Sequence, residues 1–311
     1  MDLQLTALAS TETPTLRSAM ARGLGFLRDA GIDSAQLDAE VLLGHVLGIE
    51  KAQLYSALGE PLSAGHRLRF QEVLERRRWR EPVAYITGRK EFWSLEFIVG
   101  PGVLIPRPET ESLVEVALDR LKSTTSGTPN ILDLGTGSGI IAVCLAKERI
   151  EANIVAVDID SSALEFARTN GRRHGVSERM DLIHDDLFAA LGRKPLFDLI
   201  VSNPPYVRTG DLSLLAPEIS RWEPMIALDG GPDGMEYYRR VIGVAHEYLA
   251  PGSSIVLEMG ADMAPVVTEL FARSGRYGPA SVYQDYGGKD RVIAAMKLPL
   301  AAAGLKGASR G

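Results

Sequence analysis

The chain has 311 residues, more than most single domains, so two domains are expected. Its hydrophobic fraction of 45% and charged fraction of 24% are typical of a globular protein and exclude wholesale disorder. A formal net charge of -6 disfavours a protein that binds long stretches of nucleic acid by neutralising phosphates.

The N-terminus carries an acid, Asp2, and no apolar stretch behind a basic start, so it does not resemble a secretory signal. We find no apolar run long enough to span a membrane. Cys144 is the only cysteine, which excludes an intrachain disulfide and a multi-cysteine metal site. We therefore expect a cytoplasmic protein with no membrane partner and no metal.

Helical spacing of apolar residues runs from Thr15 to Arg80 and predicts a small bundle of about four helices. Residues 1–81 are therefore expected to form an all-helical N-terminal domain. A run of basic residues, Arg76 to Arg80, lies at the end of this stretch and is the nearest approach to a basic patch. Cations suit helix C-termini, so a solvated helix end is the simpler interpretation. The apolar positions are Leu16, Met20, Leu24, Leu27, Leu37, Val41, Leu42 and Val46.

The pattern changes to short β-prone runs separated by glycine and proline between residues 82 and 108. The runs cover 91–93 and 95–99, and they predict a β-hairpin linker between two domains.

Strand-like apolar runs alternate with amphipathic helical stretches in residues 109–298. This alternation predicts an α/β fold with one doubly wound, seven-stranded sheet. The tail, 299–311, is short, basic and rich in small residues, which predicts disorder. The expected strands are 131–134, 154–157, 180–183, 197–201, 254–258, 281–284 and 292–296.

Three alternating glycines follow the first of these strands, and an apolar helix begins directly after them. Such a loop brings backbone N–H groups close to a ligand at the carboxyl edge of the sheet. A dinucleotide fingerprint would need a further glycine at the position of Ile140, so the spacing favours a different ligand. A tight turn without a ligand is the alternative. The loop comprises Gly135, Thr136, Gly137, Ser138 and Gly139.

Acidic residues follow the next two strands at the same edge of the sheet. Asp158 is expected to accept both hydroxyls of a ribose, although it could instead cap the following helix, a role that suits Asp160 or Ser161 better. Asp186 could accept from an adenine amino group, and Leu187 and Phe188 could cover the ring. Those two apolar residues could equally be plain core.

The tetrapeptide Asn203-Pro204-Pro205-Tyr206 follows the fourth strand directly. Its prolines remove two backbone donors and stiffen the turn, leaving carbonyl oxygens that only accept. An –NH2 group bound there would donate to the Asn203 side-chain oxygen and to the Pro204 carbonyl, while Tyr206 stacks on its planar face.

This turn suits the methylation of a planar nitrogen. An amide nitrogen is a poor nucleophile because its lone pair is delocalised, so it must be oriented and its developing positive charge stabilised. Two acceptors do both during in-line attack on a sulfonium methyl group. We therefore expect Asn203, Pro204 and Tyr206 to be catalytic, with no histidine or cysteine needed as a base.

Together these residues resemble the class I methyltransferases with an Asn-Pro-Pro-Tyr motif, and in particular the protein-(glutamine-N5) methyltransferases of peptide-chain release factors. Further segments share the resemblance, which covers nearly the whole chain before the tail. These are Gly88, Phe92, Phe97 and Val99, then 103–111, Glu223-Pro224, Ala227-Leu228, 230–234 and 289–292.

The resemblance implies a class I methyltransferase domain that uses S-adenosylmethionine and releases S-adenosylhomocysteine. It implies methylation of the glutamine in the Gly-Gly-Gln motif of release factors, which the helical domain helps to dock. By position, the glycine loop, Asp158 and Asn203 hold the cofactor, and residues 203–206 hold the glutamine amide. Some relatives carry an aromatic residue where Leu187 stands. A monomer without stable nucleic acid is expected.

Three other functions remain open. An N6-adenine methyltransferase would present the same planar –NH2 to the same turn, but the acidic balance and the lack of a visible recognition domain disfavour it. A non-catalytic cofactor-binding protein would not need the intact turn at Asn203. A nicotinamide dehydrogenase is disfavoured by the glycine spacing.

Overall fold

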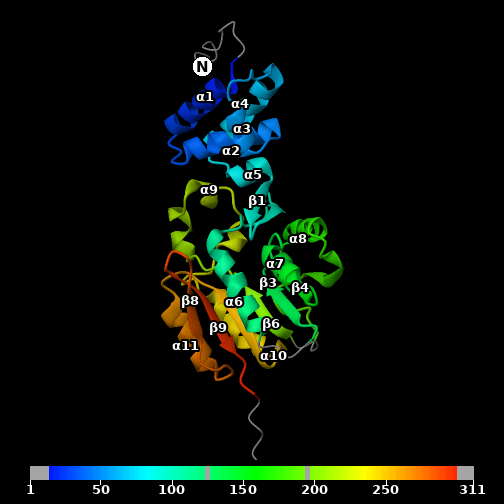
Figure 1. The fold of residues 1–311 in the computed structure, drawn as a ribbon. Helices are drawn as coiled ribbons and strands as arrows, with labels where there is room; N and C mark the ends of the chain where they lie inside the picture. The colour runs from blue at the N-terminus through cyan, green and yellow to red at the C-terminus, as the bar shows by residue number, and fades with distance from the viewer. Residues whose placement is uncertain (1–13, 123–126, 193–196, 300–311) are drawn as a thin grey trace, which may run out of the picture. The chain divides into compact units, whose positions relative to one another are not determined.

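The computed structural model describes residues 14–122, 127–192 and 197–299, and these form two compact units (Figure 1). Among the described residues, unit 1 comprises 14–88 together with 217–222, and unit 2 comprises the rest. The tail for which disorder was predicted lies outside the described residues, except for Pro299.

Unit 1 is helical, as the apolar spacing predicts. Leu27, Leu42, Leu43 and Leu54 are fully buried in its core. The division between the units falls at Gly88 rather than at residue 81, because a short helix at 83–87 packs against the second helix of this unit. The helices are α1 Leu16–Asp29, α2 Ala35–Leu47, α3 Lys51–Ser56, α4 Ala64–Arg78, α5 Val83–Thr87 and α9 Pro217–Ser220.

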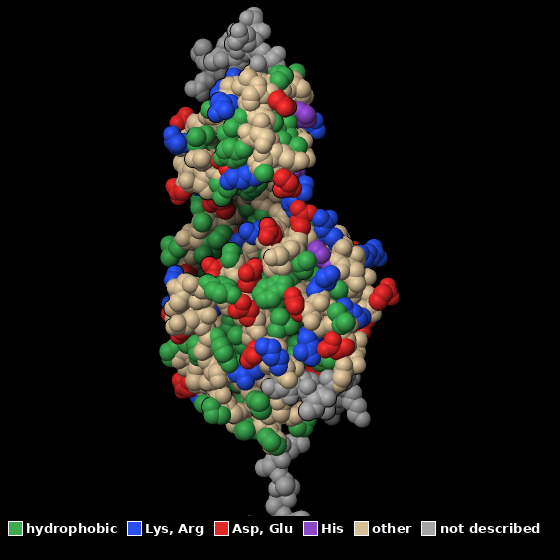
Figure 2. Space-filling view, viewed as in Figure 1, with side chains coloured by type: hydrophobic (Ala, Val, Ile, Leu, Met, Phe, Trp, Pro, Cys, Tyr) green, Lys and Arg blue, Asp and Glu red, His purple; other side chains and the backbone are tan. Residues whose placement is uncertain are grey.

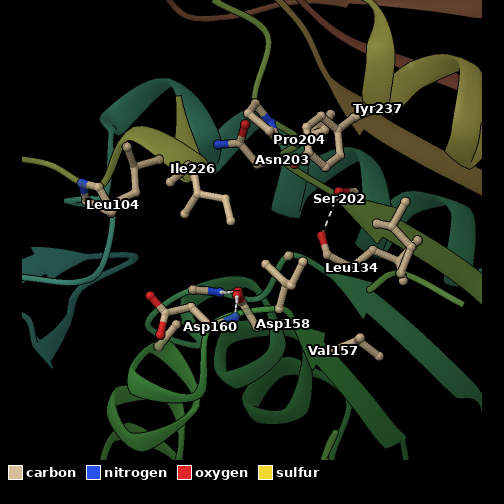
Figure 3. Close-up of a pocket in the computed structure, with 18 of the residues that line it drawn as sticks. Leu104, Leu134, Val157, Asp158, Asp160, Ser202, Asn203, Pro204, Ile226 and Tyr237 are labelled. Atoms are coloured by element: carbon tan, nitrogen blue, oxygen red, sulfur yellow. Dashed lines mark hydrogen bonds between the residues drawn. The ribbon is translucent and has the colours of Figure 1, made fainter. Parts of the chain in front are cut away.

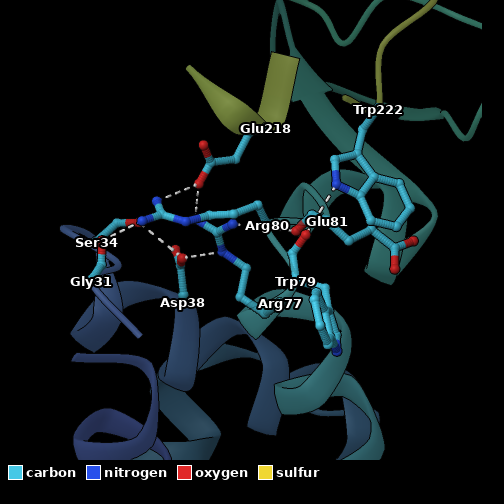
Figure 4. A network of polar contacts seen from close by, with 9 residues as sticks. All are labelled: Gly31, Ser34, Asp38, Arg77, Trp79, Arg80, Glu81, Glu218 and Trp222. Carbon is cyan, nitrogen blue, oxygen red and sulfur yellow. Dashed lines mark hydrogen bonds and ion pairs between the residues drawn. The ribbon is translucent and has the colours of Figure 1, made fainter. Parts of the chain in front are cut away.

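A partly buried ion-pair network holds α9 onto the other helices of unit 1 (Figure 4). Arg77 donates from Nε to Asp38 Oδ2 at 2.7 Å and from Nη2 to Glu218 Oε1 at 2.9 Å. Arg80 reaches the same Glu218 oxygen at 3.1 Å and also donates to the Gly31 carbonyl. The basic run is thus only partly a solvated helix end, because Arg77 and Arg80 are held by acceptors within the unit.

Replacing Arg77 with methionine is expected to lower the free energy of unfolding by about 3 kcal/mol, because Asp38 would stay buried without its cation. Urea titration followed by circular dichroism measures the change. The control is Arg69→Met on the same helix, where the side chain is exposed and the expected change is below about 0.5 kcal/mol. Equal losses in the two variants would contradict the prediction.

The predicted hairpin is present as β1 Arg89–Phe92 and β2 Leu95–Ile98, and it belongs to unit 2. Its two turn residues, Trp93 and Ser94, both have φ of 55°, the left-handed geometry that a two-residue hairpin needs. The Trp93 backbone N–H donates to Glu111 Oε1 at 2.9 Å, which ties the turn to the start of the next helix.

A seven-stranded sheet forms the centre of unit 2, in the order β5-β4-β3-β6-β7-β9-β8. All seven predicted strands are confirmed; the pairings from β5 to β7 are parallel, and β9 is antiparallel to both β7 and β8. The strands are β3 Asn130–Leu134, β4 Asn153–Asp158, β5 Met180–His184, β6 Phe197–Ser202, β7 Leu249–Glu258, β8 Ser281–Gln284 and β9 Asp290–Met296.

Helices cover both faces of this sheet. α10 and α11 share a core with Leu132, Leu134, Ile255 and Leu257, whose side chains point to one face because alternate strand residues do. α6, α7 and α8 contact the strands outside that core. The predicted doubly wound α/β fold is confirmed. These helices are α6 Glu111–Lys122, α7 Ile140–Glu148, α8 Ser161–Arg173, α10 Glu236–Tyr248 and α11 Ala264–Ser274, with short 3-10 turns at Pro108–Thr110, Ser177–Arg179, Thr209–Leu214 and Met225–Ala227.

Among the described residues, no helix combines the length and apolar character needed to cross a membrane.

Candidate active site

A cleft opens at the carboxyl edge of the sheet, where the loops after β3, β4, β5 and β6 meet (Figure 3). The space between its walls is about 770 Å³, including the solvent at its mouth. Figure 3 shows Asn203 and Pro204 on one side of the cleft and Asp158 and Asp160 on the other. The edge that the sequence predicts for both sites is therefore one continuous cleft.

The glycine loop presents open backbone to this cleft. Gly135 and Gly137 line it with φ of 70° and 56°, and a Cβ at either position would meet no atom within 4 Å. The N–H groups of Gly135 and Thr136 donate to the Val157 carbonyl at 2.8 and 3.0 Å, which joins the loop to the next strand. A ligand can thus approach the main chain of these two glycines closely.

Thr136, Ser138 and Gly139 do not line the cleft, although their spacing placed them among the expected cofactor contacts. Thr136 is buried and donates to Asp133 Oδ2 at 2.7 Å, and the Ser138 carbonyl accepts from Asn170. A Cβ on Gly139 would lie 3.0 Å from Ala167, so this glycine lets α7 approach α8. These residues shape the loop from behind.

Asp158 lines the cleft and does not cap α8. Its Oδ2 accepts from the Gly137 N–H at 2.7 Å and its Oδ1 from the Asp160 N–H at 2.9 Å. Asp160 is the cap, accepting from the Ser162 N–H at 2.8 Å. Burial raises the pKa of Asp158, and the two backbone donors oppose that rise. The carboxylate is left with free lone pairs beside open space.

Asp186 and Leu187 also line the cleft, but each has a feature that the sequence did not predict. Asp186 Oδ2 accepts from Arg240 Nη2 at 2.6 Å, so an arginine already shares this acceptor. Leu187 has φ of 59°, a left-handed conformation that is costly for leucine. Phe188 is core, since it is buried and stacks on Tyr248 with ring centroids 5.0 Å apart.

Asn203, Pro204 and Pro205 line the opposite side of the cleft. The Asn203 Nδ2 donates to Thr110 Oγ1 at 3.3 Å, which leaves its Oδ1 as an acceptor. Tyr206 is different, because it is not among the cleft-lining residues and its hydroxyl donates to the buried Glu258 at 3.4 Å. Burial, reinforced by Glu258, raises the pKa of Tyr206 to about 12, so the phenol stays protonated. Stacking of its ring on a substrate remains a prediction.

The segment 230–234 packs against the backbone of the Asn-Pro-Pro-Tyr turn. The backbone N–H of Gly230 donates to the Val207 carbonyl at 2.8 Å. A Cβ on Gly230 would lie 2.8 Å from Tyr206 Cα, and a Cβ on Gly234 would lie 2.5 Å from the Tyr206 carbonyl oxygen. Both glycines therefore permit a close approach of two backbones beside the turn.

A second set of contacts, made by Glu223, lies beside the cleft. Glu223 is buried, accepts from the Ile105 N–H at 3.0 Å and pairs with Arg107. This contact joins two segments that the sequence resemblance had singled out separately, and it fixes the start of the stretch that brings Pro224 and Ile226 to the cleft.

Sequence reasoning missed Thr110 and Glu258 as neighbours of the turn. Glu258 lies at the carboxyl end of a correctly predicted strand, so the edge argument used for Asp158 would have found it. Thr110 carries no such signal, because the 3-10 turn that places it beside Asn203 depends on tertiary packing.

The matching family models and similar known proteins point to the same family. Residues 18–88 match the family model described as the PrmC N-terminal domain, and residues 110–218 match the methyltransferase small domain. The chain is 41% identical to a release factor glutamine methyltransferase of Geobacter sulfurreducens, covering 91% of this chain and 98% of that one. It is 40% identical to one of Moorella thermoacetica, covering 91% and 99%, and 41% identical to one of Cereibacter sphaeroides, covering 92% and 98%.

Proposed function

This chain belongs to the family of release factor glutamine methyltransferases, and from that premise we propose that it methylates a release factor, on the side-chain amide nitrogen (N5) of the glutamine in the Gly-Gly-Gln motif. The observation that carries the proposal is the single cleft that Asn203 and Pro204 share with the glycine loop and Asp158.

The cleft fits S-adenosylmethionine as the cofactor. The open backbone at Gly135 and Gly137 suits the amino-acid end, and the free lone pairs of Asp158 suit the two ribose hydroxyls. Leu187 supplies an apolar contact for the adenine, and Asp186 a polar one that Arg240 shares. When bound, this group supplies an electrophilic methyl on a sulfonium sulfur.

The residues of the turn prepare the amide for attack. Asn203 Oδ1 and the Pro204 carbonyl accept the two hydrogens of the glutamine –NH2, which fixes the direction of its nitrogen. As that nitrogen becomes positive, the same acceptors stabilise the hydrogens it carries. The methylated amide is then a strong acid and loses one proton to solvent, so the chain needs no buried base.

The distribution of charge supports a protein substrate over nucleic acid. Two arginines of the basic run pair with acceptors inside unit 1, and Figure 2 shows acidic and basic side chains interspersed on the viewed face. An N6-adenine enzyme would need a continuous basic face for the phosphates. The monomeric state, the cytoplasmic location and the absence of stable nucleic acid remain predictions.

Methyl transfer from labelled S-adenosylmethionine tests the proposal directly. Purified release factor, its variant with Gln→Glu in the Gly-Gly-Gln motif, and duplex DNA are offered side by side. Label on the unaltered release factor alone is the expected result. Label on DNA would favour the adenine enzyme, and label on none of the three would favour the non-catalytic protein.

Asp158→Ala is expected to weaken cofactor binding about 10- to 100-fold, because it removes a charged acceptor from the cleft. Isothermal titration with S-adenosylhomocysteine measures the change. Asp181→Ala, an exposed carboxylate on β5, is the matched control and should bind as the unaltered protein does. An unchanged affinity in Asp158→Ala would place the ribose elsewhere.

A further inference from the structure

The direction of the Asn203 side chain matters for the reaction that we have proposed, and this inference rests on that function. An amide has an accepting end, Oδ1, and a donating end, Nδ2, of nearly the same shape. Only the accepting end can hold a substrate –NH2. Something in the protein must therefore distinguish the two ends, which sterics alone cannot do.

Thr110 is the direct neighbour of the donating end. It is 1% exposed, and its Oγ1 accepts from Asn203 Nδ2 at 3.3 Å. A hydroxyl has one proton and can also donate it. If Thr110 gave that proton to Asn203, the amide would have to turn its Oδ1 inward and its Nδ2 into the cleft. The direction of Asn203 thus depends on where the Thr110 proton goes.

Glu258 supplies the acceptor for that proton. It ends β7, directly beside Asn203, because Ser202 of β6 is in register with Leu257. The Tyr206 hydroxyl donates to Glu258 Oε1 at 3.4 Å, and interaction with the Thr110 hydroxyl lowers the pKa of the same carboxyl group. Glu258 is 1% exposed, and among the described residues its buried Oε2 has no hydrogen-bond partner, which leaves it as an open acceptor beside the Thr110 hydroxyl. A carboxylate only accepts, so both hydroxyls must point their protons toward it.

We propose that Glu258 and Thr110 are positioning residues that set the direction of the catalytic amide. The Glu258 carboxylate accepts from Thr110, the Thr110 oxygen therefore accepts from Asn203 Nδ2, and Asn203 Oδ1 faces the methyl acceptor. The same carboxylate holds the Tyr206 hydroxyl, so both ends of the Asn-Pro-Pro-Tyr turn are fixed by one buried group.

The buried Glu258 carboxylate lowers the stability of the folded protein, whereas an ion pair with a purely structural role would raise it. Burial raises the pKa of Glu258 to about 7, against the lowering effects of Thr110, Arg291 and Tyr206. Two other groups face it: Glu109 raises the pKa further, and the Tyr238 hydroxyl donates to its backbone carbonyl. Since the folded-state pKa lies above the unfolded one, stability falls as pH rises between about 4.5 and about 7. A neutral isostere should remove that cost.

The test uses Glu258→Gln, Thr110→Val and Thr110→Ser in the full chain at pH 8, with the release factor as substrate. Glu258→Gln and Thr110→Val should each lower kcat about 10- to 100-fold, because the amide is no longer held in one direction. The KM for S-adenosylmethionine should stay within about twofold. Thr110→Ser restores the hydroxyl and should recover most of the loss. The double variant should fall no further than the lower single variant, since both act through one amide.

Thermal melting distinguishes the proposed positioning role of Glu258 from a purely structural role. Glu258→Gln should melt no lower than the unaltered protein at pH 8, and its advantage should shrink toward about pH 5, where Glu258 of the folded protein is largely protonated. A Glu258→Gln variant with unaltered kcat would overturn the inference, as would a kcat loss matched by a lower melting temperature, or additive losses in the double variant.

The assay of the unaltered protein keeps the two proposals apart. No turnover on the release factor would overturn the proposed function and this inference with it. Turnover by the unaltered protein with an equally active Glu258→Gln would overturn the inference alone.

Discussion

Replacing Asn203 with alanine is expected to lower kcat on the release factor about 100- to 1,000-fold. The substitution deletes one of two acceptors that orient the substrate –NH2 and stabilise its hydrogens as charge develops, and a single such contact has this order of effect. The glycine loop and Asp158 stay in place, so cofactor affinity should fall only about threefold. Single-turnover kinetics and titration with S-adenosylhomocysteine measure the two quantities separately.

Asn153→Ala is the matched control for that variant. Asn153 is exposed at the start of β4, at the opposite edge of the sheet from the cleft, so both kcat and cofactor affinity should be unaltered. A loss of cofactor affinity in Asn203→Ala as large as its loss of turnover would contradict the division of roles, because Asn203 would then act mainly in holding the cofactor.

Gly234→Ala is expected to have the second largest effect, on stability and activity together. Gly234 has φ of 76°, and its Cβ would lie 2.5 Å from the Tyr206 carbonyl oxygen, so the Asn-Pro-Pro-Tyr turn must move. We expect a loss of about 3 kcal/mol in the free energy of unfolding and about 100-fold in kcat, since small displacements of reacting groups are costly. Denaturant titration and release-factor methylation measure the two losses.

Gly288→Ala is the control that separates the effect of left-handed backbone strain from the effect of a steric clash with the turn. Gly288 has a nearly equal φ of 73°, but a Cβ there would meet no atom within 4 Å. This variant should lose only the about 1–2 kcal/mol of a left-handed alanine and keep its turnover. If both variants lost the same stability and neither lost activity, the close approach of Gly234 to the turn would not matter for turnover.

The strands of unit 2 were predictable because local patterns specify them. A buried parallel strand is a short apolar run between turn residues, and such runs alternate with helical periodicity through residues 130–296. The carboxyl ends of parallel strands meet at one edge, so the glycine loop, Asp158 and Asn203 could be placed together without coordinates. Within the glycine loop, however, spacing could not separate Gly135 and Gly137, which face the cleft, from Gly139, which packs on Ala167.

Only the tertiary structure decided which distant residues meet. The segment 217–222 belongs to unit 1 although its neighbours in sequence belong to unit 2, because Glu218 pairs there with Arg77 and Arg80. Thr110 lies 93 residues before Asn203 in the chain, on a 3-10 turn, and no periodic pattern relates such positions. The hydrogen bond between them depends on side-chain directions that packing sets. The sequence by itself therefore determined the architecture and the edge that carries the site, while the folded chain decided how the catalytic amide is held.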